Sequence, residues 1–264
     1  FKMIKGPLFS IITINYNDCV GLQRTLDSVV NQSYQDFEYI VIDGDSDDGS
    51  KDLLDLYNDK IDYCISEKDT GVYNAMNKGL VKATGQYVLF LNGGDHFYNL
   101  NTLEDNYKKI HSEDLVYFNI SVALENESYI KTYPTEITFS YLFKDTLPHP
   151  ATFIKKTLFD KIGLYDEGLK IVSDWKFFIL ALAKYNASYR YVNTVFSTFY
   201  FDGISSDKEN VDVQMSERQS VIDSEFSILK KDTEELISLK RLMVDLKASR
   251  KIKWLTKFKL INKF

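Results

Sequence analysis

Residues 66–95 read SEKDTGVYNAMNKGLVKATGQYVLFLNGGD, and this stretch indicates a loop, a helix, a strand and a second loop in that order. Residues 72–81 predict the helix. Residues 86–91 (QYVLFL) form a short apolar run of the kind found in buried strands. Residues 61–66 predict another strand just before the helix. Together they form a strand–helix–strand unit.

Toward the N-terminus the same alternation occurs twice more. Residues 8–14 (LFSIITI) and 37–43 (FEYIVID) are apolar, β-branched runs that predict strands buried on both faces. Residues 18–32 predict a helix that begins at an Asp18 cap, and residues 50–57 predict a second helix. This fourfold alternation predicts an α/β fold, with a Rossmann-like, mostly parallel sheet between two layers of helices.

A polar or acidic loop follows each of the four predicted strands. These loops are residues 15–17 (NYN), 43–49 (DGDSDDG), 67–71 (EKDTG) and 92–95 (NGGD). Ligands of parallel α/β sheets bind beyond the carboxyl ends of the strands. We therefore expect the four loops to converge at one edge of the sheet and to form a binding site there.

The composition of these loops suits a hard divalent cation that accompanies a diphosphate. Mg²⁺ or Mn²⁺ fits better than Zn²⁺, because the chain has only two cysteines and three histidines. In the fourth loop, Gly93 and Gly94 allow the backbone to approach a ligand, which makes Asp95 the candidate metal ligand. Two alternatives stay open: acidic loops often form only a solvated rim, and Asp95 is also placed to cap a following helix.

After residue 102 the pattern is mixed, and beyond residue 205 it is helical almost to the end. The predicted helices lie near residues 103–110, 139–143 and 174–184, and the predicted strands near residues 115–120, 129–133, 151–154 and 189–200. The last part of the chain also has a sevenfold repeat of apolar residues. Its members are Met215, Ile222, Leu229, Leu236 and Met243. This heptad seam either packs on the body of the protein, which its partly filled second position favours, or pairs with a second copy.

Charge is distributed unevenly along the chain. The net charge is −6, yet residues 247–264 contain seven Lys or Arg and no Asp or Glu. Trp254, Leu255 and Phe258 fall on one side of this basic tail, a pattern that suits an anionic membrane surface. The acidic body disfavours a nucleic-acid partner.

Composition also bounds the kind of protein. With 264 residues and 44% hydrophobic content, the chain can bury a core. Its cysteines, Cys19 and Cys64, lack metal or redox spacing, which suits a reducing cytoplasm. No window approaches the roughly 20 apolar residues of a membrane span, and the N-terminus lacks a signal-peptide pattern. We therefore expect a soluble or peripheral protein.

Several stretches together carry a family resemblance. They are SIITINYN (10–17), VIDGDSDDGS (41–50), the quoted residues 66–95, HPATFIKK (149–156) and VSDWKFF (172–178). With them, residues 8–205 resemble the family 2 glycosyltransferases, inverting enzymes of the GT-A fold. The similarity is greatest to the bacterial branch that builds O-antigen and exopolysaccharide. The residues after this region carry no such resemblance.

The resemblance implies a nucleotide site made from the first three loops. Thr13, Asn15 and Tyr16 lie where the family holds the nucleobase, and Asp43 lies where it hydrogen-bonds the uracil. Asp69 belongs to the loop that closes over the nucleotide. These five residues are the expected nucleotide contacts.

The resemblance also implies a metal ligand and a base. Asp95 matches the metal-binding aspartate of the DxD-type signature, although residues 92–94 (NGG) stand where many relatives carry further aspartates. Asp174 matches the general base, and it is also placed to cap the helix that follows, a role compatible with that of a base. His149, which lies between two prolines, and Trp175 are expected to contact the acceptor or a phosphate, with a structural role as the alternative for His149.

The implied function is transfer of a sugar with inversion, assisted by Mn²⁺ or Mg²⁺. The donor is expected to be a UDP-hexose or UDP-N-acetylhexosamine, and the acceptor a sugar, lipid-diphosphate-linked, in cell-surface polysaccharide synthesis. Residues 1–205 would form the GT-A catalytic domain, with a nucleotide-binding half at about 8–98 and an acceptor half at about 99–205. Residues 206–264 would form a helical extension with the basic tail.

A binding module and a nucleotidyltransferase are the alternative functions. A non-catalytic nucleotide-sugar or carbohydrate-binding module is disfavoured by the presence of both Asp95 and Asp174. A sugar nucleotidyltransferase would need a glycine-rich, basic loop after the first strand, and residues 15–18 (NYND) are not one. For the glycosyltransferase we expect a cytoplasmic location at the inner face of the membrane, peripheral contact through the tail, and either no self-association or a homodimer through the C-terminal helix.

Overall fold

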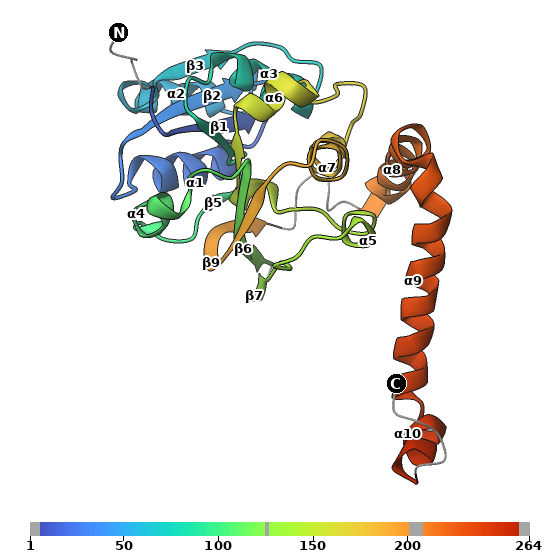
Figure 1. The fold of residues 1–264 in the computed structure, drawn as a ribbon. Helices are drawn as coiled ribbons and strands as arrows, with labels where there is room; N and C mark the ends of the chain where they lie inside the picture. Colours follow the sequence, from blue (N-terminus) through green and yellow to red (C-terminus); the bar gives the residue numbers. More distant parts are fainter. Residues whose placement is uncertain (1–5, 125–126, 201–207, 259–264) are drawn as a thin grey trace.

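The computed structural model describes residues 6–124, 127–200 and 208–258 (Figure 1). Within these residues nine strands form one curled sheet in the order β3-β2-β1-β4-β8-β6-β9-β5, and β7 pairs with β6. The strands are β1 Phe9–Asn15, β2 Phe37–Asp43, β3 Tyr63–Ser66, β4 Tyr87–Phe90, β5 His96–Phe97, β6 Leu115–Ala123, β7 Ser128–Lys131, β8 Thr152–Lys155 and β9 Tyr189–Tyr200. The α-helices are α1 Cys19–Val30, α2 Ser50–Tyr57, α3 Val72–Lys82, α4 Thr102–Asn106, α5 Phe139–Leu142, α6 Thr157–Ile162, α7 Ser173–Ile179, α8 Val211–Glu225, α9 Ser227–Ala248 and α10 Arg250–Lys257.

The strands β3, β2, β1 and β4 are mutually parallel, which confirms the predicted α/β fold. Every residue of β1 is buried, as its apolar, β-branched run predicts. Asn15 at the end of β1 pairs with Asp43, and Asp43 pairs with Ser66 at the end of β3. This register brings the carboxyl ends of three strands to one edge.

Two local features shape the helices beside this sheet: a cap begins α1, and a glycine lets α3 approach β1. Asp18 Oδ1 accepts a hydrogen bond of 2.9 Å from Gly21 N, so the predicted cap begins α1. On α3, Gly79 lies directly on β1, because a β-carbon there would be only 2.5 Å from Ile12 Cγ2. Glycine thus permits a close helix–strand contact that any side chain would disrupt.

The second half of the sheet reverses direction. β8 runs antiparallel to both β4 and β6, and β6 and β9 then pair in parallel. The sequence did not predict the two-residue strand β5 or the helix α6. The helix predicted over residues 174–184 begins at Ser173 and passes into a π-helical turn, Leu180–Lys184. Asp174 therefore lies in the first turn of α7 and is not its N-cap, which is Val172.

The helix α8 packs on the body through a second apolar core. In this core Val221, Ile222 and Phe226 of the C-terminal segment meet Leu142 and Trp175. The extension is thus joined to the rest of the molecule by buried side chains as well as by the chain itself.

The predicted heptad seam is divided by the fold. The chain turns at Phe226 between α8 and α9, because its ring packs on Phe139 with the ring centroids 5.2 Å apart. Beyond the turn, α9 projects away from the body and carries α10 (Figure 1). The prediction of one continuous heptad seam is therefore wrong, because the repeat is divided between α8 and α9.

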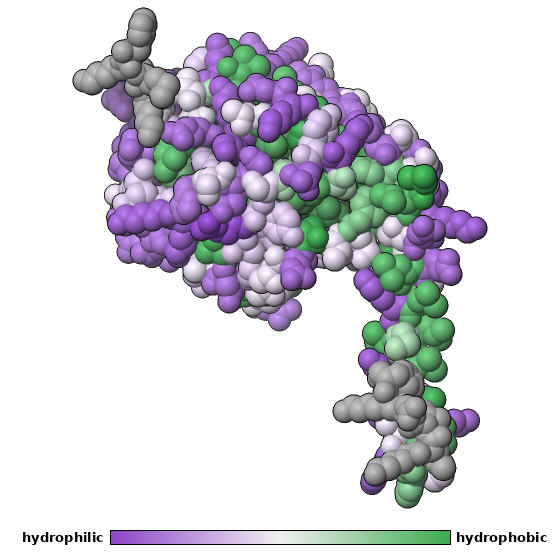
Figure 2. All heavy atoms as spheres, in the orientation of Figure 1, coloured by the Kyte–Doolittle hydropathy of each residue, from purple (hydrophilic) through white to green (hydrophobic). Residues whose placement is uncertain are grey.

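The part of the seam on α9 stays largely uncovered. Leu229, Leu236 and Met243 are 42%, 44% and 40% exposed. Figure 2 shows apolar side chains along this helix. In the parts of the chain that the structure describes, none of the helices combines the length and the apolar character that crossing a bilayer requires.

Candidate active site

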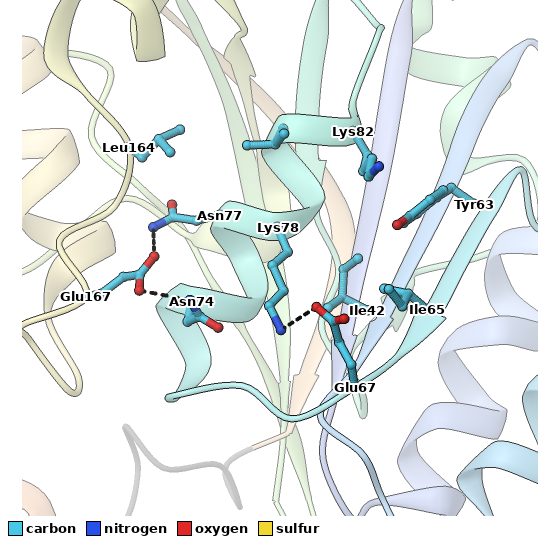
Figure 3. Close-up of a pocket in the computed structure, with 11 residues that line it drawn as sticks. Ile42, Tyr63, Ile65, Glu67, Asn74, Asn77, Lys78, Lys82, Leu164 and Glu167 are labelled. Carbon is cyan, nitrogen blue, oxygen red and sulfur yellow. Dashed lines mark hydrogen bonds and ion pairs between the residues drawn. The ribbon is translucent and has the colours of Figure 1, made fainter.

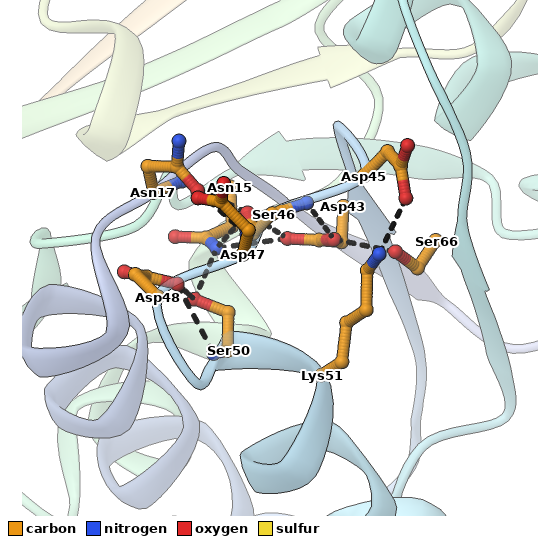
Figure 4. Close-up of polar contacts among 10 residues, drawn as sticks. All are labelled: Asn15, Asn17, Asp43, Asp45, Ser46, Asp47, Asp48, Ser50, Lys51 and Ser66. Atoms are coloured by element: carbon orange, nitrogen blue, oxygen red, sulfur yellow. Dashed lines mark hydrogen bonds and ion pairs between the residues drawn. The ribbon is translucent and has the colours of Figure 1, made fainter.

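The four loops that follow the parallel strands converge around Asn15, as predicted. Figure 4 shows the polar contacts of the first two loops and Ser66. Asn15 Nδ2 donates to Asp43 Oδ1 at 2.9 Å and to Ser50 Oγ at 3.0 Å, which joins the first and second loops. The amide of Glu67 donates to Asp43 O at 3.0 Å, and the amide of Gly93 donates to Ile14 O at 2.9 Å. The third and fourth loops therefore lie beside the first two.

Asp43 is the buried centre of this network. Its carboxylate accepts hydrogen bonds from Asn15 Nδ2, from Ser66 Oγ at 2.6 Å, and from Ser46 through Oγ at 2.6 Å and N at 2.9 Å. Burial by itself would raise the pKa of Asp43, but these hydrogen bonds outweigh it and hold the pKa below its usual value. The carboxylate is thus ionised, and it organises the loops in this structure.

Two polar residues that the sequence did not single out also shape the second loop. Asp48 accepts hydrogen bonds from Cys19 N at 2.7 Å and from Ser50 Oγ at 2.6 Å, so it ties the loop to the start of α1. Ser46 Oγ accepts from Asn17 N at 2.8 Å. The run of Asp and Ser in residues 43–50 was the available signal, because short hydroxyl and carboxylate side chains bond to nearby backbone.

The side chains of Tyr16 and Asp69, from the first and third loops, lie over Gly44 of the second loop. A β-carbon built there would be 2.7 Å from Asp69 Oδ2 and 3.0 Å from Tyr16 Cδ2. Gly44 thereby lets the first and third loops meet above the second. The Tyr16 ring is 67% exposed and offers an open aromatic face for a flat ligand. Asp69 itself is oriented by the amide of Gly71, which donates to Oδ1 at 2.9 Å.

The fourth loop presents its backbone to the same cluster. Gly94 has φ of +99°, a conformation that glycine adopts without strain, and a β-carbon on Gly93 would be 2.9 Å from Asn15 Oδ1. Asp95 is nearly buried, and its backbone oxygen accepts from Thr25 Oγ1 at 2.6 Å. Since the strand β5 follows directly, the alternative that Asp95 caps a helix is wrong.

These residues fit a cation that is shared with a diphosphate. Asn15 Oδ1 and Asn92 Oδ1 are buried oxygens that accept no hydrogen bond from the described residues. The described residues contain no group of three carboxylate, His or Cys side chains arranged to hold a metal by themselves. Magnesium is usually held by one or two carboxylates together with substrate phosphates. Asp95 with a bound diphosphate matches that arrangement, whereas a cation site made of protein alone does not.

Asp174 is linked to the nucleotide half by Tyr73. The Tyr73 hydroxyl donates to Asp174 Oδ1 at 2.9 Å and lies 2.6 Å from Ile171 O, so its one hydrogen is shared between two acceptors. Burial, and then the charge of Asp174, raise the pKa of Tyr73 well above its ordinary value. The phenol is therefore a donor at neutral pH. Tyr73 was missed in the sequence, although it lies in the quoted stretch of residues 66–95.

Three of the expected contact residues are turned into the interior. Thr13 Oγ1 donates to Leu91 O at 2.7 Å inside the sheet, and Trp175 Nε1 donates to Leu142 O at 2.6 Å in the second core. His149 Nε2 lies 2.9 Å from Tyr165 Oη, and its ring stacks on Phe90. Burial lowers the pKa of His149. Thr13 and Trp175 are buried and are not open to a ligand, whereas His149 is half-buried.

Two pockets lie beside α3, and both are lined in part by Asn74 and Glu167. The first, of about 320 Å³, is lined by residues that include Tyr63, Glu67 and Lys78 (Figure 3). The Lys78–Glu67 ion pair at 2.8 Å belongs to this lining, and Glu67 is the first residue of the third loop. The second, of about 330 Å³, is lined in part by Tyr73 and Ile171. It therefore adjoins the segment that carries Asp174.

A parallel α/β sheet with glycine-rich acidic loops at its carboxyl edge, faced by a carboxylate from a second half, defines a glycosyltransferase of the GT-A type. Residues 10–166 match the family model described as Glycosyl transferase family 2. The chain belongs to this family. It is thus a glycosyltransferase, which sets aside the binding-module and nucleotidyltransferase alternatives.

Known proteins are similar to the chain in sequence and in fold. The PGL/p-HBAD biosynthesis glycosyltransferase of Mycobacterium bovis (strain BCG / Pasteur 1173P2) is 32% identical over 214 residues, which cover 77% of this chain and 82% of that protein. The structure of S. aureus TarS 1-349 with UDP-GlcNAc aligns with a TM-score of 0.63 and 20% identity over 81% of this chain and 66% of the other. Mannosyltransferase PcManGT from Pyrobaculum calidifontis, in complex with GDP-Man and Mn²⁺, aligns with a TM-score of 0.59 and 12% identity over 96% and 84%.

Proposed function

We propose that this glycosyltransferase moves a sugar from a UDP-sugar, a UDP-hexose or UDP-N-acetylhexosamine, to a hydroxyl of a saccharide acceptor with inversion at the anomeric carbon. The observation that carries the proposal is the Tyr73–Asp174 hydrogen bond of 2.9 Å. It places a half-buried carboxylate of the second half against the helix that follows the third nucleotide loop. The UDP and UDP-GlcNAc complexes of S. aureus TarS support the choice of nucleotide.

In the proposed site the base of the donor lies on the exposed Tyr16 ring between Gly44 and Asp69. Asn15 and Asp43 hold these loops in place through their shared hydrogen bond. Stacking on Tyr16 contributes affinity for any flat base, so the selectivity for uracil comes from polar groups at the loop edge. Thr13 and Trp175 act behind this surface as packing residues, and the half-buried His149 stays a predicted contact of the acceptor or of a phosphate.

The transfer step needs one base and one displacement. The acceptor oxygen forms a bond to the anomeric carbon while the bond from that carbon to the diphosphate oxygen breaks, and the diphosphate leaves with the electron pair. The acceptor proton goes to the Asp174 carboxylate. Because the entering oxygen attacks opposite the leaving group, a single displacement inverts the anomeric centre.

Asp95 would hold Mn²⁺ or Mg²⁺ together with the donor diphosphate, and the cation supplies neutralisation of the charge that develops on the leaving group. The chain's own contribution is the glycine backbone of residues 93–94, which leaves room for the diphosphate. Since residues 92–94 supply no further carboxylate beside Asp95, metal and donor are expected to bind together.

The division of the chain follows from these roles. We assign the nucleotide to residues 8–98, the acceptor to residues 99–205 and an accessory role to the helical extension, residues 206–264. The boundary at residue 205 lies outside the described residues.

The acceptor is proposed to be lipid-linked in cell-surface polysaccharide synthesis, with the basic tail on the cytoplasmic face of an anionic membrane. A homodimer through the exposed residues of α9 stays a prediction from the heptad pattern.

The test is a donor panel. The protein is incubated with UDP- and GDP-sugars in manganese, and nucleotide release is measured with and without saccharide acceptors. Acceptor-stimulated release of UDP from one sugar donor, with inverted product by proton NMR, is expected. Stimulated release from GDP-sugars alone would contradict the donor assignment, and a product of retained configuration would contradict the single displacement.

A further inference from the structure

The helix α8 makes a polar contact with the chain just before Asp174. Glu217 of α8 accepts hydrogen bonds from the backbone amides of Lys170 at 2.6 Å, Ile171 at 3.0 Å and Val172 at 3.3 Å. A carboxylate that accepts three successive amides holds that backbone strongly, because charge-assisted hydrogen bonds are about twice as strong as neutral ones. The segment of residues 170–172 leads directly into α7.

The same segment is held from its other side by Tyr73. The Tyr73 hydroxyl contacts both Ile171 O and Asp174 Oδ1, at 2.6 and 2.9 Å. Glu217 therefore accepts a hydrogen bond from the backbone amide of Ile171. The Tyr73 hydroxyl contacts the backbone carbonyl of the same residue and the carboxylate of Asp174. Any shift of residues 170–172 moves the acceptor that shares the Tyr73 hydrogen with Asp174.

The neighbouring residue on α8 holds the start of α7 by a second contact. The Arg218 guanidinium lies 4.8 Å from the centre of the Trp175 ring and donates to Lys144 O at 3.1 Å. Trp175 directly follows Asp174 and is buried in the second core. Adjacent side chains of α8 thus engage the residues on both sides of the base.

We propose that Glu217 is a positioning residue, which holds the base Asp174 in place for transfer through residues 170–172 and Tyr73. This inference rests on the proposed function of Asp174. It makes α8 a working part of the active site, although the sequence after residue 205 carries no resemblance to the family. The contacts to residues 170–172 come from α8, so the exposed helices α9 and α10 are not part of this proposal.

The test compares Glu217→Ala and Glu217→Gln with the control Glu235→Ala in the full chain. Glu235 is an exposed carboxylate on α9, so its loss changes charge equally without touching residues 170–172. Misplacing a catalytic group by about 1 Å can cost about 10²-fold in rate. We expect kcat to fall 10- to 100-fold, on the order of that estimate, in Glu217→Ala, and less in Glu217→Gln, which keeps one acceptor oxygen. The control is expected to keep the parent kcat.

Donor binding separates positioning from simple structural loss. The convergent loops do not contact Glu217, so UDP affinity by calorimetry and the donor KM are expected to match those of the parent. A fall of UDP affinity alongside kcat in Glu217→Gln would overturn the inference, because it would show general disruption. Parent-like kcat in Glu217→Ala would overturn it as well.

A double-mutant cycle with Tyr73→Phe gives a readout that a merely structural role would not produce. If both residues act through Asp174, their effects on kcat are expected to be clearly less than multiplicative. Independent, multiplicative effects would contradict the proposal. The base assignment fails separately: if Asp174→Asn transfers at the parent rate, the proposed function is wrong whatever Glu217 does. If Asp174→Asn stops transfer while Glu217→Ala does not, only the positioning inference is wrong.

Discussion

The Tyr73 hydroxyl lies 2.9 Å from Asp174 Oδ1 and joins two parts of the chain that are 101 residues apart. Tyr73 is in the first turn of α3, directly after the third nucleotide loop, and Asp174 is in the first turn of α7. The contact therefore couples the loop proposed to close over the donor with the carboxylate proposed to accept the acceptor proton. One hydrogen bond therefore joins the proposed base to the helix that follows the third loop.

Replacing Tyr73 by Phe is expected to lower kcat about 10-fold and to leave UDP affinity unchanged. The substitution removes the donor to Asp174 but keeps the ring, and loss of orientation by one group costs on the order of this factor when the base itself remains. Single-turnover transfer and calorimetry on the same preparation measure the two effects. Tyr57→Phe is the control, because its hydroxyl bonds Asp27 at 2.5 Å on α1. Equal loss in both variants would rule out the orienting role.

Asp174→Asn is expected to stop transfer while donor binding continues. The asparagine keeps the size and an acceptor oxygen for Tyr73 but cannot take a proton, and loss of a positioned base typically costs about 10²–10⁴-fold. A transfer assay is paired with titration of UDP. Transfer at more than about a tenth of the parent rate, far above that estimate, would mean that another residue is the base.

Asp95→Ala is expected to weaken UDP binding in manganese and to have little effect in chelator. The reason is that Asp95 is the carboxylate proposed to hold the cation against the diphosphate. Calorimetric titrations of UDP with manganese and with EDTA compare the two states. Asp52→Ala, on the exposed side of α2, serves as a control of equal charge change. Equal UDP affinity of Asp95→Ala and parent in manganese would contradict the metal assignment.

Acid is expected to destabilise the protein as the pH falls below about 6.5, which is the ordinary pKa of a histidine side chain. Burial lowers the pKa of both His149 and His96 in the fold, so the unfolded chain takes up protons that the folded chain resists. The free energy of unfolding therefore decreases from about pH 6.5 down to the lowered folded values. Urea unfolding between about pH 8 and pH 5 on either side of that value measures the slope.

Substitutions of the two histidines test whether they cause this pH dependence of the free energy of unfolding. In His149→Phe the ring contact with Phe90 remains while the titrating group is lost, so the slope is expected to become shallower than that of the parent. The His96→Gln, His149→Phe double variant should be shallower still. An unchanged slope in both variants would show that other groups govern the acid limb.

Deleting residues 247–264 is expected to reduce binding to anionic liposomes and to leave donor hydrolysis intact. Each basic residue near such a surface contributes about 1 kcal/mol at most, and salt screens it. Cosedimentation with phosphatidylserine vesicles at low and high salt measures the effect, and zwitterionic vesicles are the control. Unchanged partition of the deletion variant at low salt would exclude the membrane role of the tail.

The local parts of this fold could be predicted from the sequence because their causes are local. The buried run of β1 and the Asp18 cap of α1 depend on residues a few positions apart. The convergence of the four loops also followed, since parallel strands bring their carboxyl ends to one edge whatever the side chains do. Even Gly93 and Gly94 were identifiable as sites of close approach.

What only the tertiary structure decided depends on residues that are distant in sequence. The strand β5 has two residues, too few for any periodic pattern, and forms because β9 supplies its hydrogen bonds. The heptad repeat ran past Phe226, yet burial of that ring against Phe139 turned the chain there. Neither Tyr73 nor Glu217 could be connected with Asp174 from spacing alone. Their contacts exist because α3 and α8 pack on opposite sides of one short segment, and packing between distant elements has no periodicity along the chain.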